Sequence, residues 1–487
     1  MNKHYCEDFP NISLTSASNF MKEDSTHVFS ETNYVNKDEH SLAASEAHYK
    51  GKPKPVLTVV DAIVMIVGIV VGAGIFRTPS LVAANTGSWE MFLLVWVLGG
   101  VVSLIGALCY AELSTTFPNT GGDYHFLMRA FGGRFAFLFA WARMSIIQTG
   151  SIALLAYIVG DYTAQLFPIG IHSSAIYAAL VVILLTTINI IGIKSGTATQ
   201  KLLVGIQFAG LLMIVIAGFL ISSSETVLQE LSTESSSSSM AMGMAMVFVL
   251  LTFGGWNEAG YISAELRSGS KKMVNVLIIS IVLITAVYLL INLAFLNVLG
   301  IERMANSQAV GVDLMRATLG EVGVMFIGIL VVIAALTSAN ATIFTGARTN
   351  YALGRDFAIF SILKKWNTRT SSPINAFIIQ GLIALLLIAI GSTTRNGFES
   401  MVEFTAPVFW FFFLATGIAL FMLRIKEPHI KRPFKVPLYP ITPIIFCSVC
   451  AYLLYSSLMY TGIGALVGVA ILISGTFFFF FIRKRPE

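Results

Sequence analysis

Two polar residues in an otherwise apolar stretch are the best placed in this sequence to do chemistry. Asn257 and Glu258 stand together within residues 240–265. A carboxylate is costly to keep ionised in apolar surroundings, and such a residue usually pairs with another group or carries function. Because burial disfavours the charged form, Glu258 is a candidate to take up and release a proton. The alternative is a structural role as the partner of a Lys, an Arg or a backbone amide.

Glycines interrupt this stretch and one other. Residues 57–83 contain Gly68, Gly72 and Gly74, and residues 240–265 contain Gly254, Gly255 and Gly260. Glycine has no Cβ, so the chain can unwind there and leave its N–H and C=O groups open to a ligand. Glycine also permits helices to pack closely. Two interruptions, one of them beside Asn257 and Glu258, favour unwinding over simple packing.

The sequence encodes no recognisable catalytic or nucleotide site. All seven His lie in the first 50 residues or between apolar stretches, and there is no Gly-x-x-x-x-Gly-Lys-Ser/Thr motif. Cys447 and Cys450 have the spacing of metal ligands but no second pair beside them, so we interpret them as packing residues. We predict neither an enzyme nor an ATP-driven pump, and no metal or cofactor.

The elements that position these residues are membrane helices. Of 487 residues, 56% are hydrophobic and 12% charged, whereas soluble domains carry about 25% charged residues. Apolar runs of about 20 residues, long enough to cross a bilayer as helices, recur along the chain without the alternation of barrel strands. We predict an all-α membrane protein with twelve transmembrane helices, at 57–83, 90–116, 133–167, 173–193, 200–222, 240–265, 273–299, 321–350, 373–392, 400–424, 438–457 and 460–482.

Charge in the connecting segments sets the orientation. One alternate set of loops and ends holds 23 Lys and Arg, and the other set holds only Arg303, Arg316 and Arg395. Positive residues stay on the cytoplasmic side, so both termini are predicted to be cytoplasmic in a multi-pass protein of the plasma or inner membrane. This topology explains the net charge of +5 without nucleic acid as a partner.

Three regions follow from these assignments. Residues 1–50 are polar and contain no apolar segment of a signal peptide, so we predict a disordered cytoplasmic tail. Residues 51–424 form the core of helices 1–10. Residues 425–487 hold helices 11 and 12 and a short cytoplasmic C-terminus.

The two interruptions lie five helices apart. A repeat of five places the two halves in opposite orientations, so the broken helices 1 and 6 are expected to meet near the membrane midplane. In that arrangement, N-terminal helix ends face an anion and free carbonyls face a cation. An α-amino acid, with a carboxylate and an ammonium a short distance apart, has the matching shape.

The sequence resembles the amino acid–polyamine–organocation superfamily, and within it the L-type amino acid transporter branch and its bacterial relatives. The resemblance covers almost the whole chain after the tail. It is carried by Gly72-Ala-Gly-Ile-Phe, Tyr110-Ala-Glu-Leu-Ser, Phe117-Pro-Asn-Thr-Gly-Gly-Asp-Tyr, Phe253-Gly-Gly-Trp-Asn-Glu-Ala-Gly-Tyr and Thr345-Gly-Ala-Arg. It implies a LeuT-like core of ten helices in a 5+5 inverted repeat, with helices 1 and 6 discontinuous and two extra C-terminal helices.

The resemblance also implies a substrate site. Amides around Ala73, Gly74 and Ile75 would hold the carboxylate, and carbonyls near Ile69, Phe253 and Gly254 would receive the amine. Asn257 matches a binding asparagine of the L-type branch. The predicted substrate-binding set is Ile69, Gly72, Ala73, Gly74, Ile75, Phe253, Gly254, Gly255 and Asn257.

The chain departs from its relatives at two positions that bear on coupling. Gln207 stands where relatives often have a Lys beside the broken first helix, and Leu251 stands where they have an aromatic gate, with Phe253 closer to the break. Thr337 and Ser338 lie in the element that supplies sodium ligands in some relatives, so they are a candidate sodium site.

Three further charged residues are expected near the cytoplasmic ends of their helices. Glu112 and Glu265, with Arg129 or Lys271 within expected reach, are interpreted as inner-gate ion pairs or as ordinary helix-end pairs. Arg143 is expected to extend to the inner interface. The predicted gating or coupling residues are Leu251, Glu258, Gln207, Glu112 and Glu265.

These features predict a secondary active transporter of small neutral L-amino acids that works by alternating access, as a proton-coupled symporter or an exchanger. A carrier of polyamines or cationic amino acids with the same fold remains open, and so does a non-transporting membrane sensor. Some L-type relatives use a disulfide-linked partner. This sequence has no external Cys near helices 3 and 4, so no obligatory partner is predicted.

Overall fold

The computed structural model describes residues 55–220, 239–267, 269–307, 309–392, 397–461 and 463–478. These residues belong to one compact unit, Gly51–Glu487. The predicted tail, residues 1–50, and most of the predicted external loop before helix 6 lie outside them. The described chain is all-helical, and its only extended pairings are isolated bridges between Leu57 and Leu266 and between Asn367 and Ser372.

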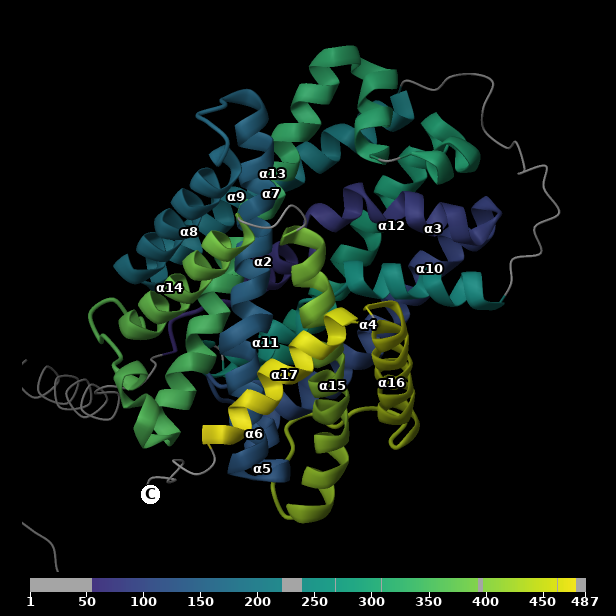
Figure 1. Cartoon of the computed structure of the whole chain (residues 1–487). Helices are drawn as coiled ribbons and strands as arrows, with labels where there is room; N and C mark the ends of the chain where they lie inside the picture. Colours follow the sequence, from purple (N-terminus) through teal and green to yellow (C-terminus); the bar gives the residue numbers. More distant parts are fainter. Residues whose placement is uncertain are drawn as a thin grey trace, which may run out of the picture. The chain divides into compact units, whose positions relative to one another are not determined.

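The helices follow the chain in the order shown in Figure 1. The α-helices are α2 (Val59–Val70), α3 (Thr78–Thr86), α4 (Trp89–Thr116), α5 (Asp123–Phe131), α6 (Gly133–Ala142), α7 (Gln148–Leu166), α8 (Ser173–Ile191), α9 (Ile193–Leu220), α10 (Ser239–Thr252), α11 (Ala259–Ile262), α12 (Met273–Asn306), α13 (Val310–Asp356), α14 (Ile374–Gly391), α15 (Gly397–Lys426), α16 (Ile441–Thr461) and α17 (Ile463–Phe477). Short 3₁₀ turns lie at Ala73–Phe76, Trp256–Glu258, Ser263–Glu265, Ser270–Lys272 and Ala358–Lys364, and a π-helical turn at Arg143–Ile147 joins α6 to α7.

Nine segments of the described chain are helical, long and apolar enough to cross a membrane. They correspond to nine of the twelve predicted helices. The first and sixth predicted helices are each broken into shorter pieces, and the last is the 15-residue α17. The prediction of a polytopic all-α membrane protein is therefore confirmed in outline, and the count of twelve crossings stays a prediction.

Several helices extend beyond the limits that hydropathy predicts. α9 begins at Ile193 rather than at residue 200, and α13 runs from Val310 to Asp356 rather than over 321–350. The chain bends inside α13 at Gly320 (φ 64°) and inside α12 at Gly300 (φ 68°), conformations that glycine adopts without steric cost. Helical structure therefore continues past the ends of the apolar runs.

Local sequence explains how α2 and α4 begin. The Thr58 side chain accepts the backbone N–H of Asp61, and the Asp61 carboxylate accepts the backbone N–H of Thr58, which is a capping box. Gly87 (φ 70°) ends α3, and the Ser88 hydroxyl then accepts the N–H of Met91 at the start of α4.

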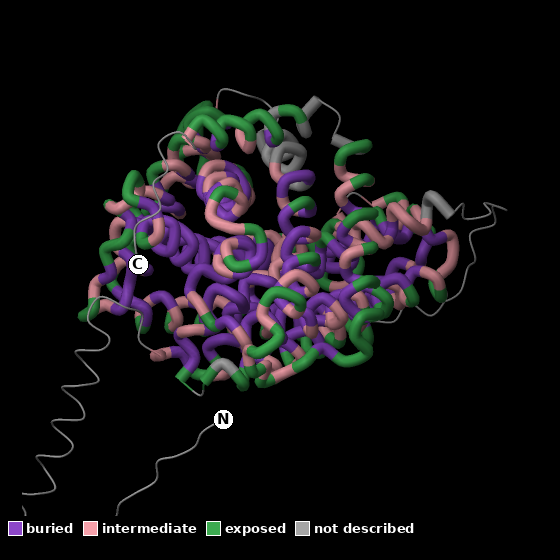
Figure 2. Tube along the Cα trace, turned by 90° about the horizontal axis from the view of Figure 1, so that it is seen from below, coloured by how far each residue is buried: buried purple, intermediate pink, exposed green. Residues whose placement is uncertain are grey.

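The broken segments lie among the long helices. α3 packs beside α10, and α12 packs against α2, α3, α4 and α9, while α13 packs against α2, α7 and α9 (Figure 1). Figure 2 shows buried residues on the inward-facing sides of the helices and exposed residues on the outward-facing sides. The interrupted chain is thus held by neighbours on several sides.

Candidate functional site

The first predicted helix is interrupted after Val70. Val71 and Gly72 leave the helical conformation, a 3₁₀ turn covers Ala73–Phe76, and α3 resumes at Thr78. Gly72 is extended (φ −102°, ψ −161°), which any residue can adopt. A Cβ at Gly72 would lie 3.0 Å from Ser338 Oγ, so this glycine permits a close approach to α13.

The sixth predicted helix is interrupted after Thr252. Gly255 has φ 115° and ψ −18°, a left-handed conformation that favours glycine, and the chain continues as the 3₁₀ turn Trp256–Glu258. Both interruptions that the sequence predicts are therefore present. Gly68 serves packing instead, because its Cβ would lie 2.2 Å from Gln200 Nε2.

The two breaks touch each other. A Cβ at Gly255 would lie 2.5 Å from Ile69 Cγ2, and one at Gly74 would lie 3.5 Å from Thr252 Cγ2. The Thr252 hydroxyl also donates to Thr78 Oγ1 at 2.8 Å. Segments about 180 residues apart in sequence thus form one junction.

A buried tyrosine on α12 joins both breaks. The Tyr288 hydroxyl lies 2.8 Å from the Val70 carbonyl oxygen and 3.0 Å from that of Thr252, so one donor is shared between the last residues of α2 and α10. The ring packs edge-on against Trp96 and Phe253, and the side chain is fully buried. Tyr288, which the sequence analysis missed, therefore fixes the relative position of the two helix ends.

Neutral side chains cap the carbonyls at the end of α2. Ser338 Oγ donates to Gly68 O at 3.0 Å and to Ile69 O at 3.3 Å, and Gln207 Nε2 donates to Val71 O. With Tyr288 on Val70, four consecutive carbonyls accept hydrogen bonds from uncharged donors. The Thr337 methyl group lies against Gly68, but its hydroxyl donates to Ile333 O in its own helix.

The backbone at the breaks is accessible. Gly74 is exposed, and Gly72, Ala73, Gly254 and Gly255 are partly exposed, whereas Ile75 is buried. Leu251 is 45% exposed, and Phe253 is buried with its ring against Trp96 and Tyr288. Neither side chain of this predicted gate lines the cavity described next.

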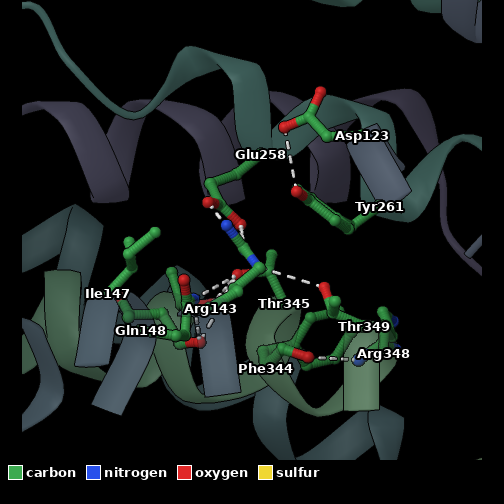
Figure 3. Close-up of polar contacts among 12 residues, drawn as sticks. Asp123, Arg143, Ile147, Gln148, Glu258, Tyr261, Phe344, Thr345, Arg348 and Thr349 are labelled. Carbon is green, nitrogen blue, oxygen red and sulfur yellow. Dashed lines mark hydrogen bonds and ion pairs between the residues drawn. The ribbon is translucent and has the colours of Figure 1, made fainter. Parts of the chain in front are cut away.

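A charged pair lies beside the sixth-helix break. Arg143 Nη2 donates to both oxygens of Glu258, at 2.8 and 2.6 Å, and Arg143 Nε donates to Thr349 Oγ1 at 3.0 Å (Figure 3). The guanidinium also stacks on the Tyr261 ring, 4.1 Å from its centroid. The expectation that Arg143 reaches the inner interface is wrong, since only 3% of the residue is exposed. A buried cation needs an anion, and Glu258 is the nearest one.

A small cavity of about 10 Å³ adjoins this pair, with room for about one water molecule. Its polar walls are Asp123, Arg143 and Asn257, and its apolar walls are Phe139, Ile147, Phe409, Phe412 and Phe413. Asp123 begins α5 and accepts a hydrogen bond from the Tyr261 hydroxyl at 2.9 Å (Figure 3). Asn257 is the one predicted substrate residue that lines this cavity.

Comparison with known proteins agrees with this architecture. A model of the family described as "Amino acid permease" matches residues 57–481. The chain belongs to the amino acid permease family. The permease is 29% identical to the b(0,+)-type amino acid transporter 1 of Rattus norvegicus over 450 residues, or 91% of each chain. It is 30% identical to the Large neutral amino acids transporter small subunit 2 of Mus musculus over 431 residues, which cover 87% of the permease and 80% of that relative.

Because it belongs to this family, the permease is an integral membrane transporter rather than an enzyme. The family match also confirms the resemblance that the sequence motifs indicated.

Two predicted inner-gate acids of the permease are paired, but not with the expected residues. Glu265 binds Arg348 through both carboxylate oxygens, and both side chains are buried. Glu112 binds Arg424 and lies 3.3 Å from Arg432. The expected partner Arg129 instead contacts Glu427 at 2.7 Å. The expected pairings were predicted from closeness along the chain, whereas the observed ion pairs join helices that are far apart in sequence.

Proposed function

We propose that the permease carries neutral L-amino acids across a plasma or inner membrane by alternating access. The observation that supports this most strongly is the junction of two accessible backbone breaks, with Gly255 against Ile69 and Tyr288 shared between both helix ends. Such unwound backbone offers N–H groups for a carboxylate and C=O groups for an ammonium at one place. We assign these roles to the amides of Ala73, Gly74 and Ile75 and to the carbonyls of Phe253 and Gly254. Ala73, Gly74 and Gly254 are accessible, whereas Ile75 and Phe253 are buried.

The charges beside the junction favour a neutral side chain. Arg143 and Glu258 offset each other in a two-oxygen ion pair, Asp123 is the one other charged residue that lines the adjoining cavity, and five of the eight lining residues are apolar. A cationic amino acid would be better served by an unpaired acid facing the junction itself. One relative of the permease is named for large neutral amino acids, which is consistent with this assignment.

Transport is proposed to be independent of sodium. A sodium ion at the first break would need carbonyls such as those of Gly68, Ile69 and Val71. Each of these already accepts a hydrogen bond from Ser338 or Gln207, and the Thr337 hydroxyl is engaged within its own helix. A neutral amide at Gln207 also leaves no titratable charge at that position.

The proposed topology has twelve crossings, a 5+5 inverted repeat in helices 1–10, and both termini in the cytoplasm. The proposal needs no disulfide-linked partner. Of the cysteines that the structure describes, Cys109 and Cys450 are buried and Cys447 is partly buried in helices. None of these thiols is presented for a link to another chain.

Purified permease in proteoliposomes tests the proposal. A panel of labelled neutral, cationic and anionic amino acids and polyamines should show saturable movement of the neutral L-amino acids. Replacing sodium by choline should leave the rate unchanged. Preference for polyamines or cationic amino acids would contradict the substrate assignment, a requirement for sodium would contradict the coupling assignment, and binding without movement would indicate a sensor.

A further inference from the structure

We propose that Asp123 is the site at which the permease binds a coupling proton. The inference rests on the proposed transport function and specifies its coupling ion. It assigns to Asp123 the role that the sequence analysis gave to Glu258.

One carboxylate oxygen of Asp123 makes no hydrogen bond of ordinary geometry, although the Tyr110 hydroxyl faces the carboxylate. The residue is 3% exposed and lines the cavity beside Asn257. Its Oδ2 accepts from Tyr261, while Oδ1 is buried and makes no hydrogen bond of ordinary geometry with any described residue. A buried acceptor left unsatisfied costs free energy. Asp123 lines a cavity with room for about one water, so a proton can reach its carboxylate through that water.

Glu258 is less suited to this role. Both of its oxygens accept from Arg143, and the guanidinium is buried. Protonating Glu258 would leave that guanidinium without its main counter-charge, which is strongly unfavourable. The acid that can gain a proton without breaking an ion pair is Asp123.

The groups around Asp123 set when it is protonated. Tyr110 faces Asp123 from α4, and Tyr261 faces it from α11. Arg143 lies in the π-helical turn, and Glu258 lies in the 3₁₀ turn Trp256–Glu258. On α6 and α15 the cavity-lining residues are phenylalanines. Burial raises the pKa of the Asp123 carboxyl to about 6, against the opposing effects of Arg143 and of hydrogen bonding by the tyrosines. Asp123 is therefore mostly protonated below that pH and mostly ionised above it.

The proton step balances without another reactant. A hydronium ion in the cavity gives its proton to the Asp123 carboxylate and remains as water, and the reverse transfer releases the proton. The Tyr110 hydroxyl, which is buried and makes no hydrogen bond of ordinary geometry, can accept from the new O–H. Protonation also weakens the bond from Tyr261, because an ionised acceptor binds more strongly. Tyr261 lies on α11, so proton uptake loosens the contact between α5 and the inner part of the broken sixth helix.

Transport measured in proteoliposomes over roughly pH 5 to roughly pH 8 tests this inference. Uptake by the unaltered permease should change severalfold with a midpoint near the pKa of Asp123. D123N should lose this dependence and behave at every pH like the protonated form. Y261F should keep the dependence with a midpoint at higher pH, because it removes a hydrogen bond to the ionised form. D356N is the matched control: Asp356 also accepts from a tyrosine, Tyr124 at 2.9 Å, and this variant should keep the original midpoint.

Infrared titration of the buried carboxyl band gives a second readout. It does not require transport, and its Y261F arm does not require the protein to fold with Asn at position 123. Y261F should move the midpoint of one buried carboxyl upward, and D123N, where it folds, should remove that band. A pH profile that persists in D123N, or a band unaffected by either variant, would overturn the inference while leaving the transport proposal intact. If no amino acid moves at any pH, the transport proposal itself fails, and the infrared result still decides whether Asp123 titrates.

Discussion

A buried guanidinium depends on its anion, and the pairing of Arg143 with Glu258 shows this at the scale of single residues. E258Q should destabilise the folded permease by about 3–5 kcal/mol, because Arg143 would remain buried and unpaired. Thermal unfolding in detergent measures the effect. The double variant R143Q/E258Q removes both charges and should regain part of the lost stability. If E258Q unfolds at the original temperature, the ion pair does not hold this region together.

Tyr288 acts through a single hydroxyl. Y288F keeps the ring between Trp96 and Phe253 but removes this donor from both carbonyls. The loss costs about 1–3 kcal/mol at Thr252 and less at Val70, whose carbonyl still accepts the Gly72 N–H. We expect amino acid affinity to fall by about tenfold, measured by direct binding to the purified protein.

Y157F is the matched control for Y288F, because the Tyr157 hydroxyl also donates to a backbone carbonyl, that of Ile388, away from the breaks. Its affinity should be unchanged. Equal effects of the two variants would mean that Tyr288 has no special role at the junction.

Residue type predicted part of the site. Asn257 and Glu258 are conspicuous because polar groups are rare in apolar stretches, and Gln207 does lie against the first break. Their partners were not predictable, because Arg143 is 115 positions from Glu258 and only the packing of helices brings the two together. Tyr288 gives no signal in sequence, since tyrosine is common in membrane helices.

At the scale of the elements, the sixth-helix break depends on Gly255. G255A should lower transport by about tenfold or more, because a left-handed backbone strains alanine by about 1–3 kcal/mol and its Cβ would meet Ile69. G205A in α9 is the control, since a Cβ there meets nothing within 4 Å. The comparison is made on initial uptake rates at equal amounts of folded protein. Full activity of G255A would mean that this conformation is not needed.

Both breaks were predictable from glycine, which acts at Gly255 through its backbone conformation and at Gly72 by permitting a close approach. The short helix α5 and the π-helical turn Arg143–Ile147 were not. α5 has nine residues, too few for a stable helix without tertiary contacts. The π-helical turn depends on one extra residue within a continuous apolar stretch, which hydropathy does not register.

At the scale of the whole molecule, long-range pairs tie the described segments together at the end where positive charge predicts the cytoplasm. The Leu57 N–H donates to Glu265 O and the Arg267 N–H donates to Leu57 O, both at 2.8 Å, which joins the start of α2 to the end of the sixth predicted helix. The Arg348 and Glu265 pair lies at the same place. Alternating access requires these ties to break when the cytoplasmic side opens.

Composition and the lengths of the apolar runs predicted an all-helical membrane protein, because both are properties averaged over many residues. Crossing order and helix contacts were predictable only as far as the charge pattern and the resemblance allowed. The predicted limits at residues 299 and 321 lie directly beside the bends at Gly300 and Gly320, but hydropathy gave no sign of the helical segments on the far side of each bend.

The central claim is that a neutral amino acid binds between the two breaks. An experimental density map of the permease with such a substrate bound tests it most directly. We predict the carboxylate at the amides of Ala73, Gly74 and Ile75, and the ammonium at the carbonyls of Phe253 and Gly254. Substrate density elsewhere, or helices that continue unbroken through Gly72 and Gly255, would contradict the account.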